Sequence, residues 1–314
     1  MARLCALLAV LMLAFGAAGC GSGGGGGSGD PPKATATGPG AGKPPVTLGT
    51  KNFTEQFILG QLYAQALRAK GWTVELKENI GSTEVADKAL DSGGIDLYPE
   101  YTGTSLSVVK GDKMHPASAA ETYAAAKAFY ESRGQTLLEA TPFEDRDAIA
   151  VTKRFAKAHS LQSMDDLNTL TGSVRIGGAP EFRTRFAGLE GLRLKYGLGT
   201  MRFVALEIDA GANYTALDKG RVDAADVFTT DPQLASGRYV VLKDPKAIFG
   251  FQNLAPVVNR KVLQRQGRGF AETLDAVSGK LTNAAMQQMN AAVALKHQDP
   301  AAVAHAFLSK NALL

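Results

Sequence analysis

The sequence predicts an α/β protein of two lobes, each a mostly parallel sheet flanked by helices. Short apolar runs typical of strands alternate with longer runs that carry apolar residues at helical spacing. This strand–helix order is typical of parallel sheets covered by helices. The order occurs twice, because a strand at 148–152 leads into a second series and another at 254–258 leads out of it. Two crossings predict a hinge, with lobe 1 formed by residues 46–147 and 254–314 and lobe 2 by residues 148–253.

The first series of elements ends in a turn that is rich in recognition chemistry. Strands are expected at 46–48, 73–80 and 95–98, with helices that begin near Thr54 and Thr83. Pro99 has no amide hydrogen, so we expect the third strand to stop there. The turn from Tyr101 to Thr104 then follows the carboxyl end of a strand, where open α/β sheets bind their ligands.

The second series and the C-terminal part follow the same reading. A helix is expected near 117–133, and the last part of the chain, about 271–314, is expected to be helical. Further strands are expected at 174–178, 201–206, 224–228 and 239–244.

The start of the chain has the features of a secretory signal. Arg3 precedes an apolar run at 4–15 that is too short to span a membrane. Small residues then lead directly into Cys20, as at a bacterial lipoprotein cleavage site, although Ala17 stands where such sites usually have leucine. We therefore expect residues 1–19 to be removed and Cys20 to be lipidated, which places the protein on the extracytoplasmic face of the cell membrane. An ordinary signal peptide cut near 17–19 is the alternative.

Residues 20–45 are rich in Gly, Ser, Pro and Thr and predict a flexible tether between the lipid and the folded body. The chain has two cysteines, Cys5 and Cys20, so the mature body has no thiol for a disulfide, a metal or a nucleophile. The formal net charge of +4 is too mild to indicate binding to nucleic acid. We therefore expect no cofactor, no metal and no nucleic-acid partner.

Enzymatic activity is not expected from the sequence. Glu100 and Asp147 could be imagined as an acid/base pair, but the chain shows no nucleophile elbow and no phosphate-binding loop. The histidines are separated in sequence and lack metal-ligand spacing, at positions His115, His159, His297 and His305.

Several segments resemble the substrate-binding proteins of glycine betaine/choline/carnitine ABC importers. They are "GTKNFTEQFILGQLYAQAL", "GSTEVADKALDSGGIDLYPEYTGT", "PEFRTRFAGLEGLRLKYGL" and "NYTALDKGRVDAADVFTTD", and the resemblance covers nearly all of residues 46–314. It implies a two-lobed periplasmic-binding-protein fold of type II. It also implies a monomeric receptor for an osmoprotectant, which hands its ligand to a membrane permease with a cytoplasmic ATPase.

The resemblance also implies a set of ligand-binding residues. Such proteins surround a quaternary ammonium with tyrosines, whose ring faces attract a cation. Lys51 matches the lysine of the "KNFTE" motif, and Tyr101 and Thr104 match the cage tyrosine and pocket threonine of "YTGT". Arg185 matches an arginine that can hold a carboxylate, although it could instead pair with Glu181 on the same segment.

Three positions depart from the tyrosine cage. Asp147, Phe228 and the Phe251-Gln252-Asn253 segment stand where many members have tyrosines. Asp147 could pair with a cation, Phe228 could offer a ring face, and we include Gln252 among the expected ligand-binding residues. Asp147 could also be a solvated member of the run "EDRD". A receptor with shifted specificity for another solute, or a solute-sensing lipoprotein, are the alternatives that these departures leave open.

Overall fold

The computed structural model describes residues 37–112, 116–170, 174–207 and 211–314. All of them belong to one compact unit, residues 32–314. The predicted signal segment, Cys20 and most of the predicted tether lie outside the described residues, so the predictions made for them stay predictions. Within the described ranges, no helix combines the length and the apolar character that a membrane crossing requires.

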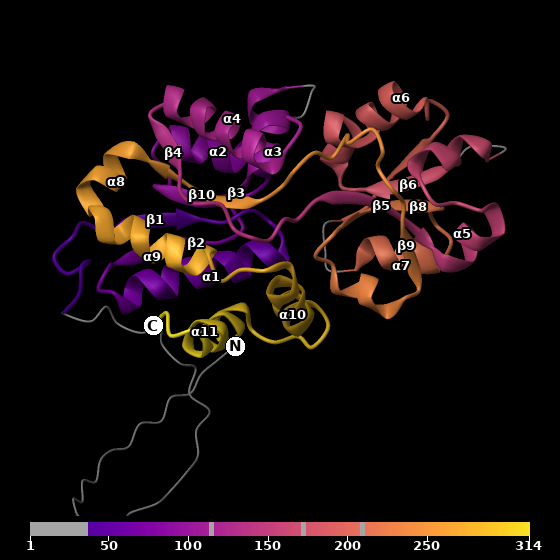
Figure 1. The fold of residues 1–314 in the computed structure, drawn as a ribbon. Helices are drawn as coiled ribbons and strands as arrows, with labels where there is room; N and C mark the ends of the chain where they lie inside the picture. The colour runs from indigo at the N-terminus through magenta and orange to yellow at the C-terminus, as the bar shows by residue number, and fades with distance from the viewer. Residues whose placement is uncertain (1–36, 113–115, 171–173, 208–210) are drawn as a thin grey trace, which may run out of the picture. The chain divides into compact units, whose positions relative to one another are not determined.

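Two five-stranded sheets form the centres of the two lobes (Figure 1). The sheet of lobe 1 consists of β1 (Val46–Gly49), β2 (Val74–Lys77), β3 (Leu97–Tyr101), β4 (Gln135–Leu137) and β10 (Leu254–Asn259). The sheet of lobe 2 consists of β5 (Asp147–Thr152), β6 (Arg175–Gly178), β7 (Arg202–Ala205), β8 (Ala224–Phe228) and β9 (Tyr239–Val241). The strand orders are β2-β1-β3-β10-β4 and β7-β6-β8-β5-β9.

The prediction of a two-lobed α/β fold is confirmed, and both sheets are mixed. The pairs β1–β2, β1–β3, β6–β7 and β6–β8 are parallel, as expected from the strand–helix order. β5 and β10, the strands that enter and leave lobe 2, run antiparallel to both of their neighbours. The residue boundaries that the sequence suggests for the lobes stay a prediction.

Helices cover both sheets and close the chain on lobe 1. In lobe 1 they are α1 (Thr54–Ala69), α2 (Thr83–Asp91), α3 (Thr102–Thr104), η1 (Ser105–Lys110) and α4 (Ala119–Ser132). In lobe 2 they are α5 (Lys153–His159), η2 (Met164–Thr169), η3 (Pro180–Arg183), η4 (Phe186–Glu190), α6 (Gly191–Tyr196), α7 (Ala212–Asp218) and η5 (Pro232–Ser236). The C-terminal part forms α8 (Arg260–Gln266), α9 (Arg268–Ser278), α10 (Asn283–Ala294) and α11 (Pro300–Lys310).

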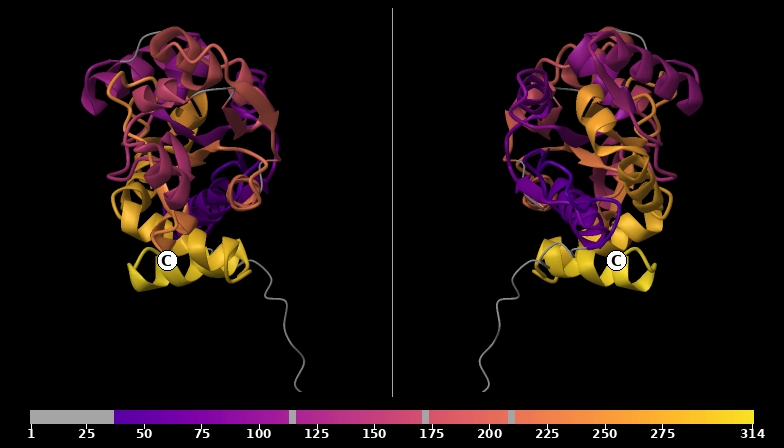
Figure 2. Two further views of the ribbon diagram at one scale, coloured as in Figure 1. Left: turned by 90° about the vertical axis from the view of Figure 1, so that its right-hand side faces the viewer. Right: turned by 90° about the vertical axis from the view of Figure 1, so that its left-hand side faces the viewer.

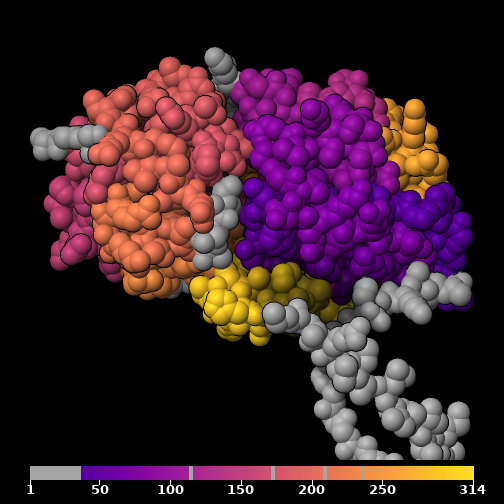
Figure 3. Space-filling view, turned by 180° about the vertical axis from the view of Figure 1, so that it is seen from behind, coloured from indigo at the N-terminus to yellow at the C-terminus, as the bar shows by residue number. Residues whose placement is uncertain are grey.

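The C-terminal helices pack on the apolar helix α1. Tyr63 of α1 shares a hydrogen bond of 2.9 Å with Ser278, and Gln65 donates one of 2.9 Å to the carbonyl oxygen of Ala301. Figure 2 shows the last two of them, α10 and α11, in yellow at one end of the fold. Seen from behind in Figure 3, this yellow part extends beneath the junction of the two lobes, so it can contribute to sites there.

The single tryptophan of the chain lies in the core of lobe 1. Trp72 is fully buried, and its ring meets the edge of Phe270 at a centroid distance of 5.7 Å. Its indole N–H donates a hydrogen bond of 3.1 Å to the side chain of Gln266. These contacts join the segment after α1 to the helices α8 and α9.

The expectation that the third strand stops at Pro99 is wrong, because β3 continues to Tyr101. Pro99 lies opposite Pro256 in the antiparallel pairing of β3 with β10. The carbonyl oxygen of Pro256 points away from β3 and accepts a hydrogen bond from the amide of Leu138. Pro99 and Pro256 therefore form a non-hydrogen-bonded pair, in which neither residue has to donate to the other. On the other side of β3, the pairing with β1 is recorded only at Leu97. Neither neighbour therefore requires an amide hydrogen from Pro99.

Candidate functional site

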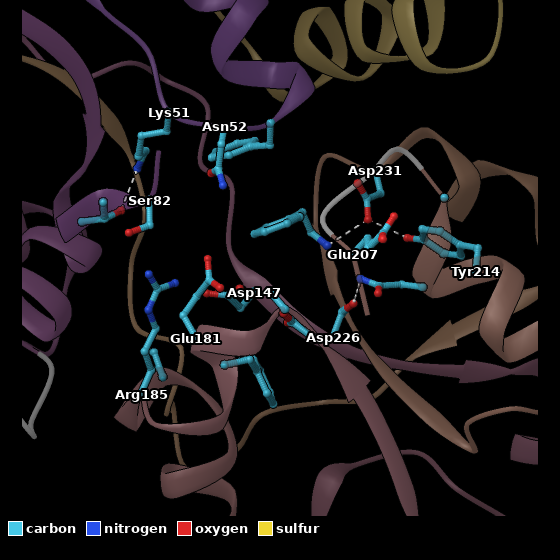
Figure 4. A pocket seen from close by; sticks show the side chains of 18 residues that line it. Lys51, Asn52, Ser82, Asp147, Glu181, Arg185, Glu207, Tyr214, Asp226 and Asp231 are labelled. Carbon is cyan, nitrogen blue, oxygen red and sulfur yellow. Dashed lines mark hydrogen bonds between the residues drawn. The ribbon is translucent and has the colours of Figure 1, made fainter. Parts of the chain in front are cut away.

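A cavity of about 100 Å³ lies between the lobes and is lined by residues of both. Lobe 1 contributes the segment from Lys51 to Phe53 and the start of α2, with Ser82 and Thr83. Lobe 2 contributes charged residues, rings and an amide, namely Asp147, Glu181, Phe182, Arg185, Glu207, Asn213, Tyr214, Asp226, Phe228 and Asp231. In Figure 4, Lys51, Ser82, Arg185 and Glu181 lie on one side and Asp226, Asp231 and Tyr214 on the other, with Asp147 between them. Both cationic side chains of the cavity therefore lie on one side, beside Glu181, while the other side is acidic and aromatic.

Two carboxyl groups of the lobe 2 sheet form the floor of the acidic side. Asp147 begins β5 and lies opposite Phe228 of β8, while Asp226 stands two residues earlier on β8. Asp147 and Asp226 therefore project from the same face of the sheet as diagonal neighbours. Burial raises the pKa of Asp147 to about 6. Burial and the neighbouring carboxylate of Asp147 raise the pKa of Asp226 well above its usual range, so the two carboxyl groups resist carrying two negative charges together.

Asp231 closes the acidic side through the turn after β8. Its Oδ2 accepts hydrogen bonds of 2.8 Å from the hydroxyl of Tyr214 and 3.0 Å from the amide of Phe228. Burial raises the pKa of Asp231 to about 6. These contacts fix the ring of Tyr214 and the backbone of Phe228 at the wall of the cavity.

Aromatic rings from both lobes meet at the cavity. Phe53, directly before α1, stacks on Phe228 with a centroid distance of 5.9 Å and an interplanar angle of 6°. Phe182 and Tyr214 contribute further lining surface. Ring faces beside carboxylates form a surface that attracts an organic cation, because both provide negative potential and the rings also exclude water.

Lys51 belongs to the opposite side but its charge is already paired. The side chain is buried, and Nζ donates hydrogen bonds of 2.6 Å to Glu100 and 3.2 Å to Thr83. Burial lowers the pKa of Lys51, against the opposing effect of Glu100. Lys51 also lies 4.5 Å from the ring centroid of Tyr101. The "KNFTE" and "YPEYTGT" motifs are thus joined by a buried ion pair, and Lys51 is anchored at the edge of the cavity.

Arg185 connects the lobes across the mouth of the cavity. Its NH2 lies 3.3 Å from both carboxylate oxygens of Glu84 on α2. Among the described residues, no acceptor meets its buried Nε. Arg185 therefore pairs with Glu84 in the other lobe and not with Glu181, the alternative that the sequence offered. Among the described residues, the hydrogen bonds of this guanidinium use only NH2, so Nε and NH1 remain as donors for a ligand.

Tyr101, Thr104 and Gln252 are not among the residues that line this cavity. Tyr101 is buried and donates a hydrogen bond of 2.7 Å to Glu55. Gln252 accepts hydrogen bonds from the amide and the hydroxyl of Thr104, at 2.9 and 3.1 Å. A side chain on Gly103 would meet the carbonyl oxygen of Phe251 at 2.4 Å, so the glycine allows this close approach. Thr104 and Gln252 thus hold the turn after β3 against the segment before β10, while Tyr101 joins the end of β3 to α1.

Of the expected ligand-binding residues, the structure thus brings Lys51, Asp147, Arg185 and Phe228 to one cavity. Sequence analysis missed Phe53, Tyr214 and Asp226 as lining residues. Phe53 lies inside the "KNFTE" motif, so the motif itself held a signal for it. Asp226 lies two residues before Phe228 on the same strand, so both side chains project from one face of the sheet. The prediction for Phe228 therefore held a signal for Asp226.

The arrangement is suited to binding a small solute. Within the described ranges, no group of three or more acidic, His or Cys side chains could hold a metal ion. What the cavity offers is an acidic and aromatic side for a cationic group, and an arginine with a free donor for an anionic group.

Comparison with known proteins gives a consistent result. The family described as the substrate-binding domain of the ABC-type glycine betaine transport system matches residues 44–310. A glycine-betaine-binding protein of Pseudomonas aeruginosa is 37% identical over 276 residues, which cover 85% of this chain and 88% of that protein. The glycine betaine-binding protein YehZ of Escherichia coli is 30% identical over 282 residues, covering 85% of this chain and 90% of that protein. A solved structure titled as a glycine betaine/carnitine/choline ABC transporter is similar with a TM-score of 0.69 and 26% identity, covering 85% of this chain and 99% of that one.

Proposed function

Because the chain belongs to the family of substrate-binding domains of ABC-type glycine betaine transport systems, we propose that its inter-lobe cavity binds a small quaternary ammonium solute, with glycine betaine as the first candidate. The family makes the protein an extracytoplasmic solute receptor of an ABC importer, and not an enzyme. The identity of the ligand is the part that we propose.

The observation that carries this proposal is the opposite polarity of the two sides of one cavity. Asp147 and Asp226 lie beside the rings of Phe228 and Tyr214, so a trimethylammonium group is stabilised there by charge and by ring faces. Across the cavity, Arg185 presents a buried Nε without an acceptor among the described residues. A carboxylate placed at this Nε would receive a charge-assisted hydrogen bond. A zwitterion with a short spacer between its charges matches both sides.

The role of Arg185 separates glycine betaine from choline, which carries no carboxylate. We expect Arg185→Gln to lower the affinity for glycine betaine by about tenfold or more, since a hydrogen bond to a charged group contributes about 1.5–3 kcal/mol. Affinity for choline should change by less than about threefold, because choline loses no charged partner. Isothermal titration calorimetry with both solutes on the wild type and the variant measures these constants.

Glu84→Gln is the matched control for this experiment. It removes the partially exposed ion pair across the lobes and leaves the guanidinium of Arg185 in place. If Glu84→Gln weakened glycine betaine as much as Arg185→Gln did, the effect would come from the link between the lobes and not from the ligand. If the wild type bound neither solute, the assignment to quaternary ammonium compounds would be wrong.

A second candidate is a solute with N–H donors, such as a protonated amine. It is favoured by Asn213, whose buried Oδ1 lines the cavity and has no hydrogen-bond donor among the described residues. A quaternary ammonium has no N–H group to satisfy this oxygen. Adding primary amines and amino acids to the panel of solutes tests this alternative directly.

The remaining parts of the proposal concern location and partners. We propose that Cys20 carries a lipid, that residues 20–45 tether the receptor to the membrane, and that a monomer delivers its ligand to an ABC permease with a cytoplasmic ATPase. The support is the small-residue run before Cys20 and the family match. Tyr101, Thr104 and Gln252 are proposed to act on the ligand through the groups they position, since they do not line the cavity.

A further inference from the structure

A second cavity, of about 70 Å³, adjoins the first one at the stacked Phe53 and Phe228 rings. These rings line both cavities. Lobe 1 contributes Glu55 from α1 and Asn290 from α10, while lobe 2 contributes the segment after β8. The second cavity is therefore formed by both lobes, as the first one is, but its polar groups other than Asp231 are different.

Its polar lining consists of hydrogen-bond acceptors with negative charge. Glu55, Asp145 and Asp231 line it, and no lysine or arginine is found among the described residues of its wall. Glu55 already accepts hydrogen bonds of 2.7 Å from each of three side chains, which belong to Tyr101, Thr230 and Asn290. Burial raises the pKa of Glu55, and burial together with the nearby Glu55 raises the pKa of Asp145 well above its usual range. Two carboxyl groups this close repel each other when both are ionised. A bound cation would relieve this repulsion, so the site favours a positively charged ligand.

An independent observation comes from two amide side chains. Asn290 is 6% exposed, and among the described residues nothing donates a hydrogen bond to its Oδ1. The orientation of the Asn290 amide is fixed by its nitrogen, because Nδ2 donates to Glu55 at 2.7 Å and to the carbonyl oxygen of Thr230 at 3.4 Å. The Oε1 of Gln233, which also lines this cavity, is buried and equally without a donor in the described part of the chain. Buried acceptors without donors are costly unless a ligand or water supplies the hydrogen.

The chemistry of these groups defines the class of ligand. Amide oxygens that lack donors need N–H or O–H groups, which a quaternary ammonium does not have. The acidic lining favours a positive charge, and the rings of Phe53 and Phe228 favour an organic one. The size of the cavity limits the ligand to a few heavy atoms.

We propose that this second cavity binds a small protonated primary amine, held by the carboxylate of Asp145 and the amide oxygens of Asn290 and Gln233. Because Asn290 belongs to lobe 1 and Gln233 to lobe 2, the bound amine links the lobes and stabilises the arrangement in which Phe53 stacks on Phe228. The site is distinct from the inter-lobe cavity and does not depend on which solute binds there.

Titration with ethylammonium chloride tests the site, using calorimetry on the full chain. We expect saturable binding to the wild type, weakened by about tenfold or more in Asp145→Asn, which removes a carboxyl group that lines only the second cavity and that would ionise beside the bound cation. Asp165→Asn is the matched control, since Asp165 pairs with Lys246 at the surface of lobe 2 and lines neither cavity. It should change ethylammonium affinity by less than about threefold.

Other outcomes overturn the proposal. Absence of saturable binding to the wild type does so, and so does a loss of binding in Asp147→Asn that is not seen in Asp145→Asn, since the amine would then occupy the first cavity. If Asp145→Asn fails to fold, Gln233→Leu takes its place, because it removes one unpartnered oxygen from a side chain that is only partly buried. Unchanged affinity in Gln233→Leu would then contradict the site.

Discussion

Replacing Lys51 with methionine lowers the free energy of unfolding by about 3–5 kcal/mol, the usual cost of breaking a buried ion pair by removing one partner. Lys51 and Glu100 are 2% and 0% exposed, and their charged atoms lie 2.6 Å apart. Without the ammonium group, the carboxylate of Glu100 would remain in the core with too few hydrogen bonds. Urea denaturation at neutral pH, followed by circular dichroism, measures the change.

A second substitution separates the ion pair from simple packing. Adding Glu100→Gln to Lys51→Met removes the stranded charge, so the double variant should recover much of the lost stability. If the double variant were as unstable as the sum of both single variants, the two residues would act independently. That result would contradict the energetic link between the two sequence motifs.

Replacing Asp147 with asparagine lowers the affinity for a quaternary ammonium ligand by about tenfold or more, because the floor of the cavity loses one of its two carboxyl groups. The side chain keeps its shape and its place at the start of β5, so the fold should be unaffected. Calorimetric titration with glycine betaine and choline measures the loss. Asp165→Asn is the matched control, since Asp165 pairs with Lys246 on the surface of lobe 2 and should leave binding unchanged.

The same carboxylate predicts how binding depends on pH. The pKa of Asp147 is raised to about 6 in the free protein, so this group loses its charge as the pH falls through that value. A bound cation stabilises the carboxylate and lowers its pKa, so binding releases a proton near this pH. Affinity should therefore be highest above about pH 7 and decline towards about pH 5. In Asp147→Asn the decline should be shallower, with Asp231 as the remaining group of similar pKa.

The fold could be predicted largely because each lobe is built from regular, periodic segments. The helix that begins at Thr54 and the strands near 46–48 and 254–258 carry clear local signals, and the structure contains them as α1, β1 and β10. The prediction for Pro99 was wrong because the missing amide hydrogen matters only where a neighbouring strand needs it. That depends on how β3 pairs with β1 and β10, which the local sequence does not show. The antiparallel course of β5 and β10 also depends on contacts between distant segments.

The candidate site was less predictable, for a physical reason. Whether a side chain lines a cavity depends on its partners, and these lie far away in the sequence. Tyr101 is directed to Glu55, and Lys51 to Glu100, by hydrogen bonds that span 46 and 49 positions. Phe53 and Phe228 meet only because the lobes bring them together. The motifs therefore indicated the neighbourhood of the cavity, while tertiary contacts decided which members of each motif form its wall.

The single tryptophan of the chain lies in the core of lobe 1, so its fluorescence reports on that lobe. Trp72 is 0% exposed and is absent from the residues that line either cavity. Tryptophan emission should therefore change little when a solute binds between the lobes. It should shift to longer wavelength when lobe 1 unfolds and water reaches the indole. Quenching of tryptophan fluorescence would therefore not detect ligand binding. The same fluorescence reports selectively on the unfolding of lobe 1, which carries the C-terminal helices.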